Sequence, residues 1–383
     1  MKLDISQANL DQALNVVKKA TSGKSPIPIL GHVLVRCLED GWLMVQAYNL
    51  EMGLTYLTPA KIYDMGETTL PAKTFCDLVD TFKRTDVLTL TLDETIQKTE
   101  IKCGRRKNNL KGVTAQEFPV VRMEGENLLT LTVPEFRRLC QVSTATVEEK
   151  SRPVMAGVHF KANGSFRAEA VDGFRAMIIT NAMVPGKQFE FIILAKNLLE
   201  ALKSLDEKEP VVISQHEGQL IITNGKFTFT GQLTEGTFAD IDSITPRNVP
   251  FSAVLNKSEF ISLLKNADII ARDAAHTVKF KVSKTDLGDF QAELKAVSAE
   301  TGDTELVMDV AWTGDFEQDK TEFLIAFNAV YMKELVEAVT TDSVKLGFRS
   351  PTAPILITGT DDGDYTAVCM PMWTEQRKKV EAE

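Results

Sequence analysis

Apolar residues recur with helical periodicity in six segments of the chain. In each segment they fall at positions i, i+3, i+4 and i+7 or a close variant, which predicts an amphipathic helix with one buried face. The helices are expected to begin near residues 6, 71, 132, 194, 256 and 328. Elsewhere, short runs of alternating apolar and polar residues predict β-strands. Two-residue hairpin turns are expected at Asp40-Gly41, Asn163-Gly164 and Asn224-Gly225, because these residue types favour positive φ.

The predicted helices are spaced regularly, roughly every 60 to 70 residues, which indicates an internal repeat. Three similar tripeptides, the landmark tripeptides, group these helices in pairs. They are Ala47-Tyr48-Asn49, Ala170-Val171-Asp172 and Ala296-Val297-Ser298, which follow one another at intervals of about 123 to 126 residues. We therefore predict three similar domains at residues 1–125, 126–248 and 249–383, with a charged C-terminal tail at 374–383.

Composition limits the class of protein. A chain of 383 residues is too long for one ordinary core, and 44% hydrophobic with 25% charged residues is typical of a globular protein. The longest apolar runs, such as residues 191–195, are far shorter than the roughly 20 residues of a membrane span. The N-terminal residues carry acids and amides where a secretory signal needs an apolar stretch, so we expect a cytoplasmic protein. The five cysteines are scattered and predict neither disulfides nor a zinc site.

Charge is distributed unevenly along the chain. The net charge of −10 argues against tight binding of nucleic acid. The six predicted helices, however, carry twelve basic and nine acidic residues, a balance of +3, which leaves −13 for everything else. By predicted domain the balance is +1, −2 and −9. The helices are therefore the part of the chain best suited to face a polyanion.

A set of motifs, taken in order along the chain, resembles the β subunit of bacterial DNA polymerase III, the sliding-clamp family. The motifs are IPILGHVLV (27–35), AYNLEMGL (47–54), TTLPAKTFCDLV (68–79), AVDGFRA (170–176), TEGTFADIDSITP (234–246), FNAVYMKELVEAV (327–339) and VCMPM (368–372).

The resemblance implies an α+β fold of three topologically similar clamp domains, each with two helices packed on two antiparallel sheets, forming half of a ring. Two chains would associate head to tail as a homodimer that encircles duplex DNA without sequence preference. The ring would act as a processivity factor, tethering the polymerase III catalytic subunit, the clamp loader and other proteins with a clamp-binding motif. Such a protein is nucleoid-associated, does not contact membranes, and has no catalytic residue, metal or cofactor.

The resemblance also assigns residues to three surfaces. A hydrophobic groove for partner peptides would be lined by Met155, Val171, Gly173, Phe174, Arg175, Ala176, Ala239 and Ile244, the last two from a strand after Gly236, and by Asn328, Tyr331, Thr352, Pro354, Met370, Pro371 and Met372. DNA-facing residues would be Lys24, Arg137, Arg138, Lys196, Lys203, Lys257 and Lys265. The dimer interface would join Arg105, Arg106, Lys107 and Leu110 to Ile269, Ile270, Glu300, Asp303 and Glu305.

Two alternatives remain open. Asp172 could serve as a general base with Arg175 as an anion clamp, which would make the protein an enzyme. Against this, the four histidines lie in no metal-binding motif, and a glycine-rich nucleotide loop is missing from the sequence. The other alternative is a monomeric β-rich DNA-binding or scaffold protein that never closes into a ring.

Overall fold

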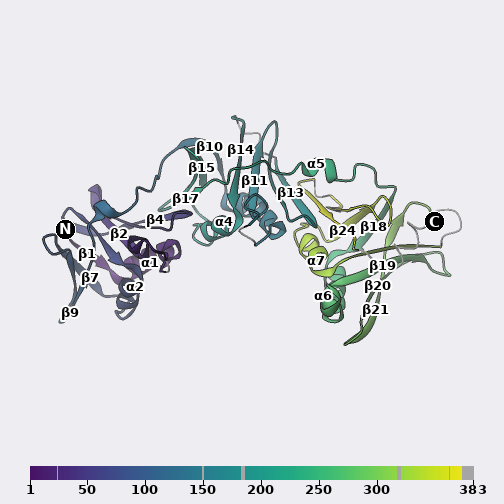
Figure 1. The fold of residues 1–383 in the computed structure, drawn as a ribbon, viewed down its shortest axis with the longest axis horizontal. Helices are drawn as coiled ribbons and strands as arrows, with labels where there is room; N and C mark the ends of the chain where they lie inside the picture. Colours follow the sequence, from purple (N-terminus) through teal and green to yellow (C-terminus); the bar gives the residue numbers. More distant parts are fainter. Residues whose placement is uncertain (24, 149–150, 183–185, 317–320, 362, 373–383) are drawn as a thin grey trace. The chain divides into compact units, whose positions relative to one another are not determined.

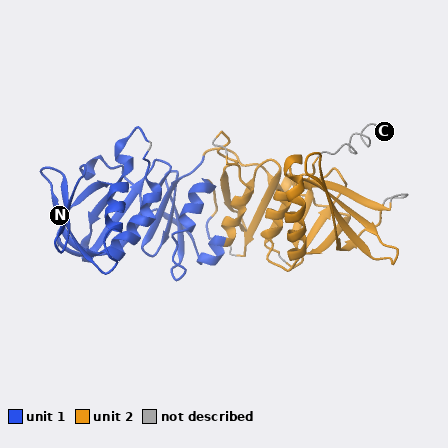
Figure 2. Cartoon of the chain, turned by 90° about the horizontal axis from the view of Figure 1, so that it is seen from below, with its two compact units in different colours: residues 1–137, 185–187, 193–234 blue, residues 138–184, 188–192, 235–383 orange. Residues whose placement is uncertain are grey.

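The computed structural model describes residues 1–23, 25–148, 151–182, 186–316, 321–361 and 363–372. It divides into two compact units (Figure 2): residues 1–137, 185–187 and 193–234 form one, and residues 138–184, 188–192 and 235–383 the other. The middle predicted domain, 126–248, contributes to both units, so the three domain borders remain a prediction. The α+β class with helices packed on antiparallel sheets is confirmed.

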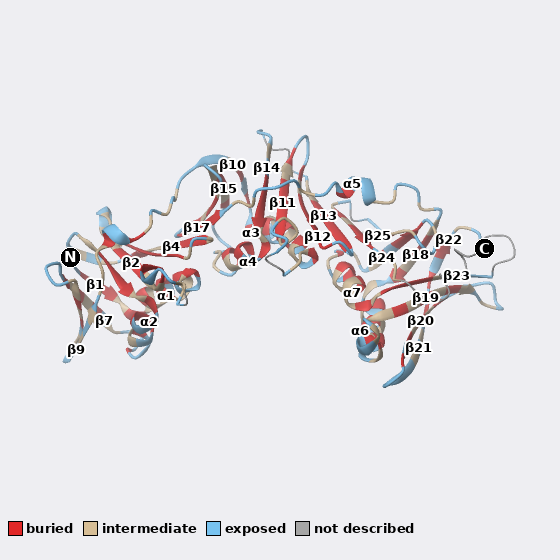
Figure 3. Ribbon diagram, viewed as in Figure 1, coloured by how far each residue is buried: buried red, intermediate tan, exposed pale blue. Residues whose placement is uncertain are grey.

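All six predicted helices are present, and each begins one residue after its predicted start. Side-chain caps explain several of these starts: the Ser6 hydroxyl accepts a hydrogen bond from the Asn9 amide at 3.3 Å, and Asn256 Oδ1 accepts one from Glu259 at 3.0 Å. A seventh, one-turn helix, α5 (Ile241–Ile244), was not predicted. The six are α1 (Gln7–Val17), α2 (Ala72–Asp80), α3 (Val133–Cys140), α4 (Ala195–Leu202), α6 (Lys257–Ala271) and α7 (Ala329–Glu337). All but α3 are labelled in Figure 1, and α3 is labelled in Figure 3.

The first unit contains two antiparallel sheets. The five-stranded sheet has the order β5 (Lys61–Asp64), β1 (Lys2–Ser6), β7 (Val87–Asp93), β8 (Lys98–Cys103), β9 (Arg106–Lys111). The eight-stranded sheet has the order β10 (Glu126–Leu131), β15 (Val211–His216), β16 (Gln219–Asn224), β17 (Phe227–Gln232), β4 (Met52–Pro59), β3 (Trp42–Tyr48), β2 (His32–Cys37), β6 (Glu67–Pro71).

The second unit is built in the same way. Its nine-stranded sheet has the order β14 (Phe189–Leu194), β11 (Gly157–Ala162), β12 (Phe166–Val171), β13 (Arg175–Asn181), β26 (Tyr365–Cys369), β25 (Ile355–Gly359), β24 (Ser343–Phe348), β18 (Phe251–Asn256), β22 (Ala311–Thr313). Its four-stranded sheet has the order β21 (Gly302–Asp309), β20 (Phe290–Ser298), β19 (Thr277–Lys284), β23 (Glu322–Asn328).

Each large sheet joins strands from two predicted domains. In the first unit β17 pairs with β4, from Phe227 opposite Tyr56 to Gly231 opposite Met52. In the second unit β13 pairs with β26 in the equivalent way, with Arg175 opposite Cys369. The helices cover these sheets with their apolar faces, which Figure 3 shows as buried. The repeat predicted from the sequence is therefore a repeat of sheets as well as of helices.

The three landmark tripeptides form equivalent turns. Each ends or follows a strand that enters a hairpin, and the side-chain oxygen of its last residue accepts hydrogen bonds from the backbone N–H groups two and three residues later. The distances are 3.1 and 2.9 Å at Asn49, 2.8 and 2.9 Å at Asp172, and 3.3 and 3.2 Å at Ser298. The residue after Asn49 is Leu50, with φ 74°, and the residue after Asp172 is Gly173, with φ 93°. Three different side chains thus make one kind of turn.

The three predicted two-residue hairpin turns require correction. Asn163-Gly164 lies in a three-residue loop with Ser165, and of the two only Gly164 has positive φ. Asn224 is the last residue of β16, so the two-residue turn is Gly225-Lys226. The Asn224 side chain accepts a hydrogen bond from the Asp206 backbone N–H at 2.6 Å and so fixes the loop that contains Asp206. Asp40 and Gly41 both have positive φ, as expected, but they end the 3-10 turn Glu39–Gly41, so the connection between β2 and β3 is longer than two residues.

Candidate functional site

Asp172 and Arg175 form a closed turn between β12 and β13. Both side chains are buried, with 7% and 8% exposed. One carboxylate oxygen of Asp172 accepts from the backbone N–H groups of Phe174 and Arg175, and the other accepts from Arg175 Nε at 3.0 Å. Gly173 adopts φ 93°, which few other residues tolerate at low cost. This local geometry explains the polar interruption that the sequence shows here.

The Arg175 guanidinium extends the turn to helix α7 and to the segment before β11. It forms an ion pair with Glu334, donates to the Thr144 carbonyl at 2.5 Å, and lies 4.5 Å from the ring centroid of Tyr331. Its hydrogen-bonding groups are therefore engaged within the protein. Because Asp172 is likewise satisfied, the pair has the properties of a buried structural ion pair and not of a general base with a free anion clamp.

Phe174 lies beside this ion pair and is 58% exposed. Its ring is stacked on Tyr331 at a centroid distance of 6.2 Å, and its carbonyl accepts from the Met370 N–H at 2.8 Å. Met370 is 39% exposed. Four of the predicted groove residues, Phe174, Arg175, Tyr331 and Met370, are thereby brought into direct contact within the second unit.

A hollow of about 550 Å³ adjoins Met370, a size typical of a ligand or peptide pocket. Ile244, Pro354 and Met370 were predicted to line the groove and do line this pocket. The other lining residues were not predicted, because they come from the one-turn helix α5, the segment after it and the β24–β25 connection, which have no periodic pattern. These are Asp242, Ser243, Thr245, Pro246, Arg247, Asn248, Arg349 and Ala353.

Several predicted groove residues have other surroundings. Val171 and Ala176 are 5% and 1% exposed and belong to a buried cluster with Ile178, Ile241 and Val368. Asn328 caps α7, since its Oδ1 accepts from Val330 and Tyr331 N–H. The expectation of a strand after Gly236 was wrong: Ala239 is exposed in an irregular segment, and Ile244 is in α5. Of the remainder, Met155, Pro371 and Met372 are half-buried and Thr352 is exposed.

The arginines among the predicted DNA-facing residues differ in availability. Arg137 is 49% exposed and pairs with Glu207 at 2.5 Å. Arg138 is only 17% exposed, and its guanidinium binds both carboxylate oxygens of Asp364, at 3.0 and 3.1 Å, and the Ala338 carbonyl. Arg138 therefore serves mainly to join the C-terminal half of α3 to the end of α7 and to the β25–β26 connection, within the second unit. Lys24 lies outside the described residues.

The predicted DNA-facing lysines lie on helices. On α4, Lys196 is exposed, and Lys203, which follows the helix, pairs with Glu200 at 2.7 Å. On α6, Lys265 pairs with Glu337 at 3.7 Å and is 60% exposed, whereas Lys257 donates to the Val339 carbonyl. Lys196, Lys203 and Lys265 are thus exposed. The latter two could leave their glutamate partners and pair with a phosphate instead.

The predicted interface residues lie at two sheet edges. β9 is the last strand of the five-stranded sheet, and its sequence RKNNLK carries three basic and no acidic residues. β21 is the last strand of the four-stranded sheet, and its sequence GDTELVMD carries three acidic and no basic residues. Arg106, Lys107 and Leu110 are in β9, and Arg105 precedes it; Asp303 and Glu305 are in β21, and Glu300 precedes it.

Apolar side chains accompany the acidic edge. Ile269 on α6 is 58% exposed, and Ile270 is half-buried. The sequence analysis missed Val307 on β21 and Val297 on β20, which are 51% and 54% exposed. Each lies two residues from a charged residue on the same face of its strand, Glu305 and Asp309 for Val307 and Lys295 for Val297, and this position on a solvent-facing side was the signal that could have identified them. On the basic edge, Leu110 is half-buried.

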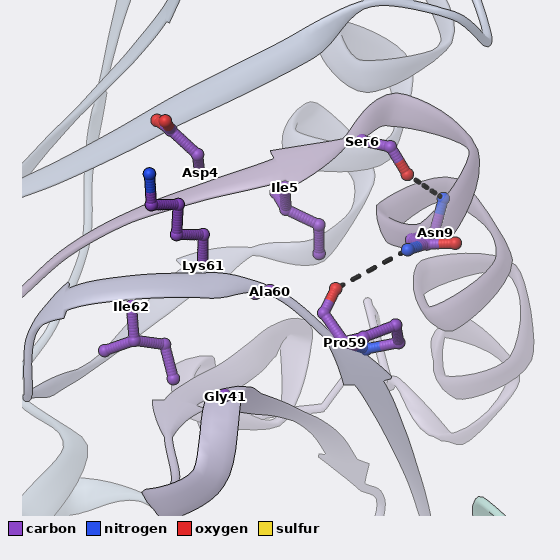
Figure 4. Close-up of a pocket in the computed structure, with 9 residues that line it drawn as sticks. All are labelled: Asp4, Ile5, Ser6, Asn9, Gly41, Pro59, Ala60, Lys61 and Ile62. Carbon is purple, nitrogen blue, oxygen red and sulfur yellow. Dashed lines mark hydrogen bonds between the residues drawn. The ribbon is translucent and has the colours of Figure 1, made fainter.

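A second hollow, of about 590 Å³, lies in the first unit beside β1 and the start of α1 (Figure 4). Asn9 spans one end by donating to the Pro59 carbonyl, and Asp4 and Lys61 lie at the other. Hydrogen bonds from Thr89 and Tyr63 hold the pKa of the Asp4 carboxyl below its ordinary value. A carboxylate stabilised in this way is a weaker base than a free one.

The described part of the chain contains no cluster of three or more metal-ligating His, Cys, Asp or Glu side chains. None of its helices combines the length and the apolarity that crossing a membrane requires.

Comparison with known proteins identifies the family. Three family models match successive parts of the chain: the N-terminal domain of the DNA polymerase III beta subunit over residues 1–122, the central domain over 130–240 and the C-terminal domain over 242–373. The beta sliding clamp of Vibrio cholerae is 26% identical over 379 residues, covering 97% of this chain and all of that protein. That of Chlamydia muridarum is 26% identical over 377 residues, covering 97% and 99%.

Solved structures have the same fold. The DNA polymerase III subunit beta of Pseudomonas aeruginosa superimposes with a TM-score of 0.88 at 22% identity, covering 98% of this chain and 100% of that one. The sliding clamp of Bacillus subtilis gives a TM-score of 0.89 at 22% identity, covering 98% and 99%. The curated relatives are named as beta sliding clamps, which confirms the predicted class of protein, a non-catalytic subunit in DNA replication. From the three matching models and the shared fold, the chain belongs to the DNA polymerase III beta subunit family.

Proposed function

We propose that two copies of this chain associate head to tail into a ring that encloses duplex DNA and tethers the replicative polymerase and other partners. The observation that carries the proposal is the pair of end strands with opposite charge, β9 with three basic residues and β21 with three acidic residues. A sheet edge has unpaired backbone groups that can pair with another strand. Opposite charges favour β9 against β21 and disfavour either strand against itself.

Apolar contact would add to this pairing. Ile269 and Val307 are each more than half exposed beside the acidic edge, and burying such side chains is favourable by roughly 1.5–3 kcal/mol each. Leu110, on the basic edge, is suited to meet them. The assigned domains, 1–125, 126–248 and 249–383, would then supply six repeats to a closed ring of two chains.

Binding to DNA would be topological. A chain with net charge −10 is not suited to tight binding of phosphates, and the release of many counterions would impede sliding. The predicted helices carry twelve basic and nine acidic residues, and two of the basic ones, Lys196 and Lys265, are exposed. Enclosure by weakly positive helices permits retention without strong adhesion.

Partner proteins would bind in the second unit, where Phe174, Tyr331 and Met370 meet the 550 Å³ pocket. Aromatic and methionine side chains offer adaptable apolar surface for short peptides.

The decisive experiment is retention on circular DNA. The chain is loaded onto nicked circular DNA with a clamp loader, free protein is removed, and half of the sample is linearised. We expect the protein to stay on circles and to leave linear molecules by sliding from the ends. Equal retention on both forms would contradict enclosure and would favour a DNA-binding protein that does not close.

A further inference from the structure

Two arginines line the 550 Å³ pocket beside Met370. Arg247 follows α5, and Arg349 follows β24, so they reach the pocket from parts of the chain that are far apart in sequence. Both are exposed. Within the described residues, neither guanidinium has a hydrogen bond or an ion pair. A guanidinium presents a planar set of hydrogen-bond donors that matches a carboxylate, so both arginines are suited to bind a carboxylate of a ligand.

The carboxylate that lines the same pocket is already engaged. Asp242 accepts two hydrogen bonds from Arg167, at 2.8 and 3.2 Å. This contact holds the pKa of the Asp242 carboxyl below its ordinary value, so the group stays ionised and paired at neutral pH. Among the described residues that line the pocket, Asp242 is the only acidic one. The balance of charge around the pocket is therefore positive.

The rest of the lining is apolar or uncharged. Ile244 is 42% exposed and Met370 is 39% exposed, and both are in reach of a ligand in the pocket. Pro246, Ala353 and Pro354 add apolar surface with little conformational freedom. A ligand that fits must therefore combine an apolar side chain with a nearby negative charge.

We propose that this pocket selects partner peptides in which an apolar anchor is flanked by an acidic side chain, and that Arg247 and Arg349 provide the selection. The inference rests on the proposed function, because it assigns specificity to the same peptide groove. The preference for acidic peptides is confined to this pocket, because residues 249–383 carry a net charge of −9, which disfavours acidic ligands elsewhere on this part of the chain. Added salt weakens the selection by screening.

The test uses three labelled peptides in fluorescence anisotropy titrations with the full chain. Each has a Leu-Leu core and an amidated C-terminus, and the core is flanked by Asp-Asp, Asn-Asn or Lys-Lys. We expect the Asp peptide to bind about five- to tenfold more tightly than the Asn peptide, a range suited to two partly exposed ion pairs. The Lys peptide binds most weakly.

Variants assign the effect to the two arginines. In Arg247→Glu/Arg349→Glu the order of the peptides reverses, whereas Arg247→Lys/Arg349→Lys keeps the order with a smaller difference, because lysine retains charge but not the planar donor set. Lys208→Glu/Lys284→Glu makes the same change in net charge at exposed positions outside the pocket and leaves the preference intact. Circular dichroism checks that each variant is folded.

Two outcomes would overturn the inference, and they differ in what they imply for the groove. Equal binding of the Asp and Asn peptides, with both weakened by Met370→Asp, would leave peptide binding in the groove intact and remove the charge selection. Failure of all three peptides to bind would remove the selection together with the proposed groove.

Discussion

Asp172 holds Arg175 through two different groups, accepting from its backbone N–H at 2.9 Å and from its Nε at 3.0 Å. One carboxylate thereby shapes the β12–β13 turn and fixes the guanidinium that reaches α7. The equivalent turn of the first unit uses Asn49, which makes the backbone contacts without any charge. Comparison of the two turns separates the role of the turn from that of the ion pair.

Asp172→Asn is expected to keep the turn and lose the ion pair. An amide oxygen can still accept from Phe174 and Arg175 N–H, but the buried guanidinium loses one of its two carboxylate partners, at a cost of about 1–3 kcal/mol. Asp172→Ala loses both functions and should cost about 1 kcal/mol more. Asn49→Ala is the matched control for the turn alone. The free energy of unfolding in denaturant measures all three, and wild-type stability of Asp172→Asn would refute the role of the ion pair.

Charge reversal at the sheet edges is expected to control dimerisation. Arg106→Glu/Lys107→Glu on β9 and Asp303→Lys/Glu305→Lys on β21 should each shift sedimentation at low salt toward monomer, because they bring like charges together. In a mixture of the two variants both interfaces of the heterodimer pair opposite charges, so dimers should form again. The matched control is Lys61→Glu on β5, at the opposite end of the same sheet as β9. Unchanged dimers in both reversed variants would contradict the proposed seam.

Apolar contact at the same seam has its own test. Ile269→Asp and Ile270→Asp should weaken the dimer at all salt concentrations, because a buried carboxylate without a partner is costly. Wild-type association should weaken as salt increases, since exposed charges are screened. A chain that sediments as a monomer at micromolar concentration in low salt would count against the ring.

Lysines on the helices are expected to affect loading more than retention. Lys196→Glu/Lys265→Glu should slow loading onto DNA several-fold at low salt, because the attraction for phosphates is reduced. Once the ring is closed on a circle, its half-life should match that of the wild type. The control is Lys208→Glu in an exposed loop. Rapid loss of the variant from circular DNA would indicate adhesion instead of enclosure.

Stability should respond to pH through the Asp242–Arg167 contact. Because the folded state lowers the pKa of Asp242, the contact stabilises the protein above the ordinary aspartate pKa of about 3.9 and stops doing so as pH falls through the lowered value. Asp242→Asn should therefore be less stable than the wild type at pH 7, by less than about 1 kcal/mol since Asp242 is half exposed, and equal to it in strong acid. Urea unfolding at both pH values measures the difference, with Asp286→Asn at an exposed position away from Arg167 as the control. A difference that persists unchanged in strong acid would assign it to another cause.

Local patterns were enough to predict the helices. Apolar periodicity gives the buried face, and residues such as Ser6 and Asn256 fix the first turn through their side chains, so the starts were accurate to one residue. The one-turn helix α5 was missed because four residues are too few to show a period. Strand partners were missed for another reason: alternation identifies a strand but not its neighbour, and β13 pairs with β26 across nearly the whole second half of the chain.

The candidate site, too, was predictable only where its structure depends on neighbouring residues in the sequence. Gly173 and its turn follow from residue type, whereas the position of Arg138 depends on Asp364, 226 residues later in sequence. Arg247 and Arg349 carry no motif, and their common pocket exists only after the segments between them have folded. Charge alone therefore could not distinguish a structural arginine such as Arg138 from an available one such as Arg349.

The pairing of β17 with β4 means that some backbone hydrogen bonds of the first predicted domain are made with a strand of the second. The amides that join Phe227 to Tyr56 and Gly231 to Met52 are protected only while both partners are folded. Hydrogen exchange at these amides should thus report cooperative opening of the whole first unit, and a truncated chain ending near residue 125 would leave β4 with an open, aggregation-prone border.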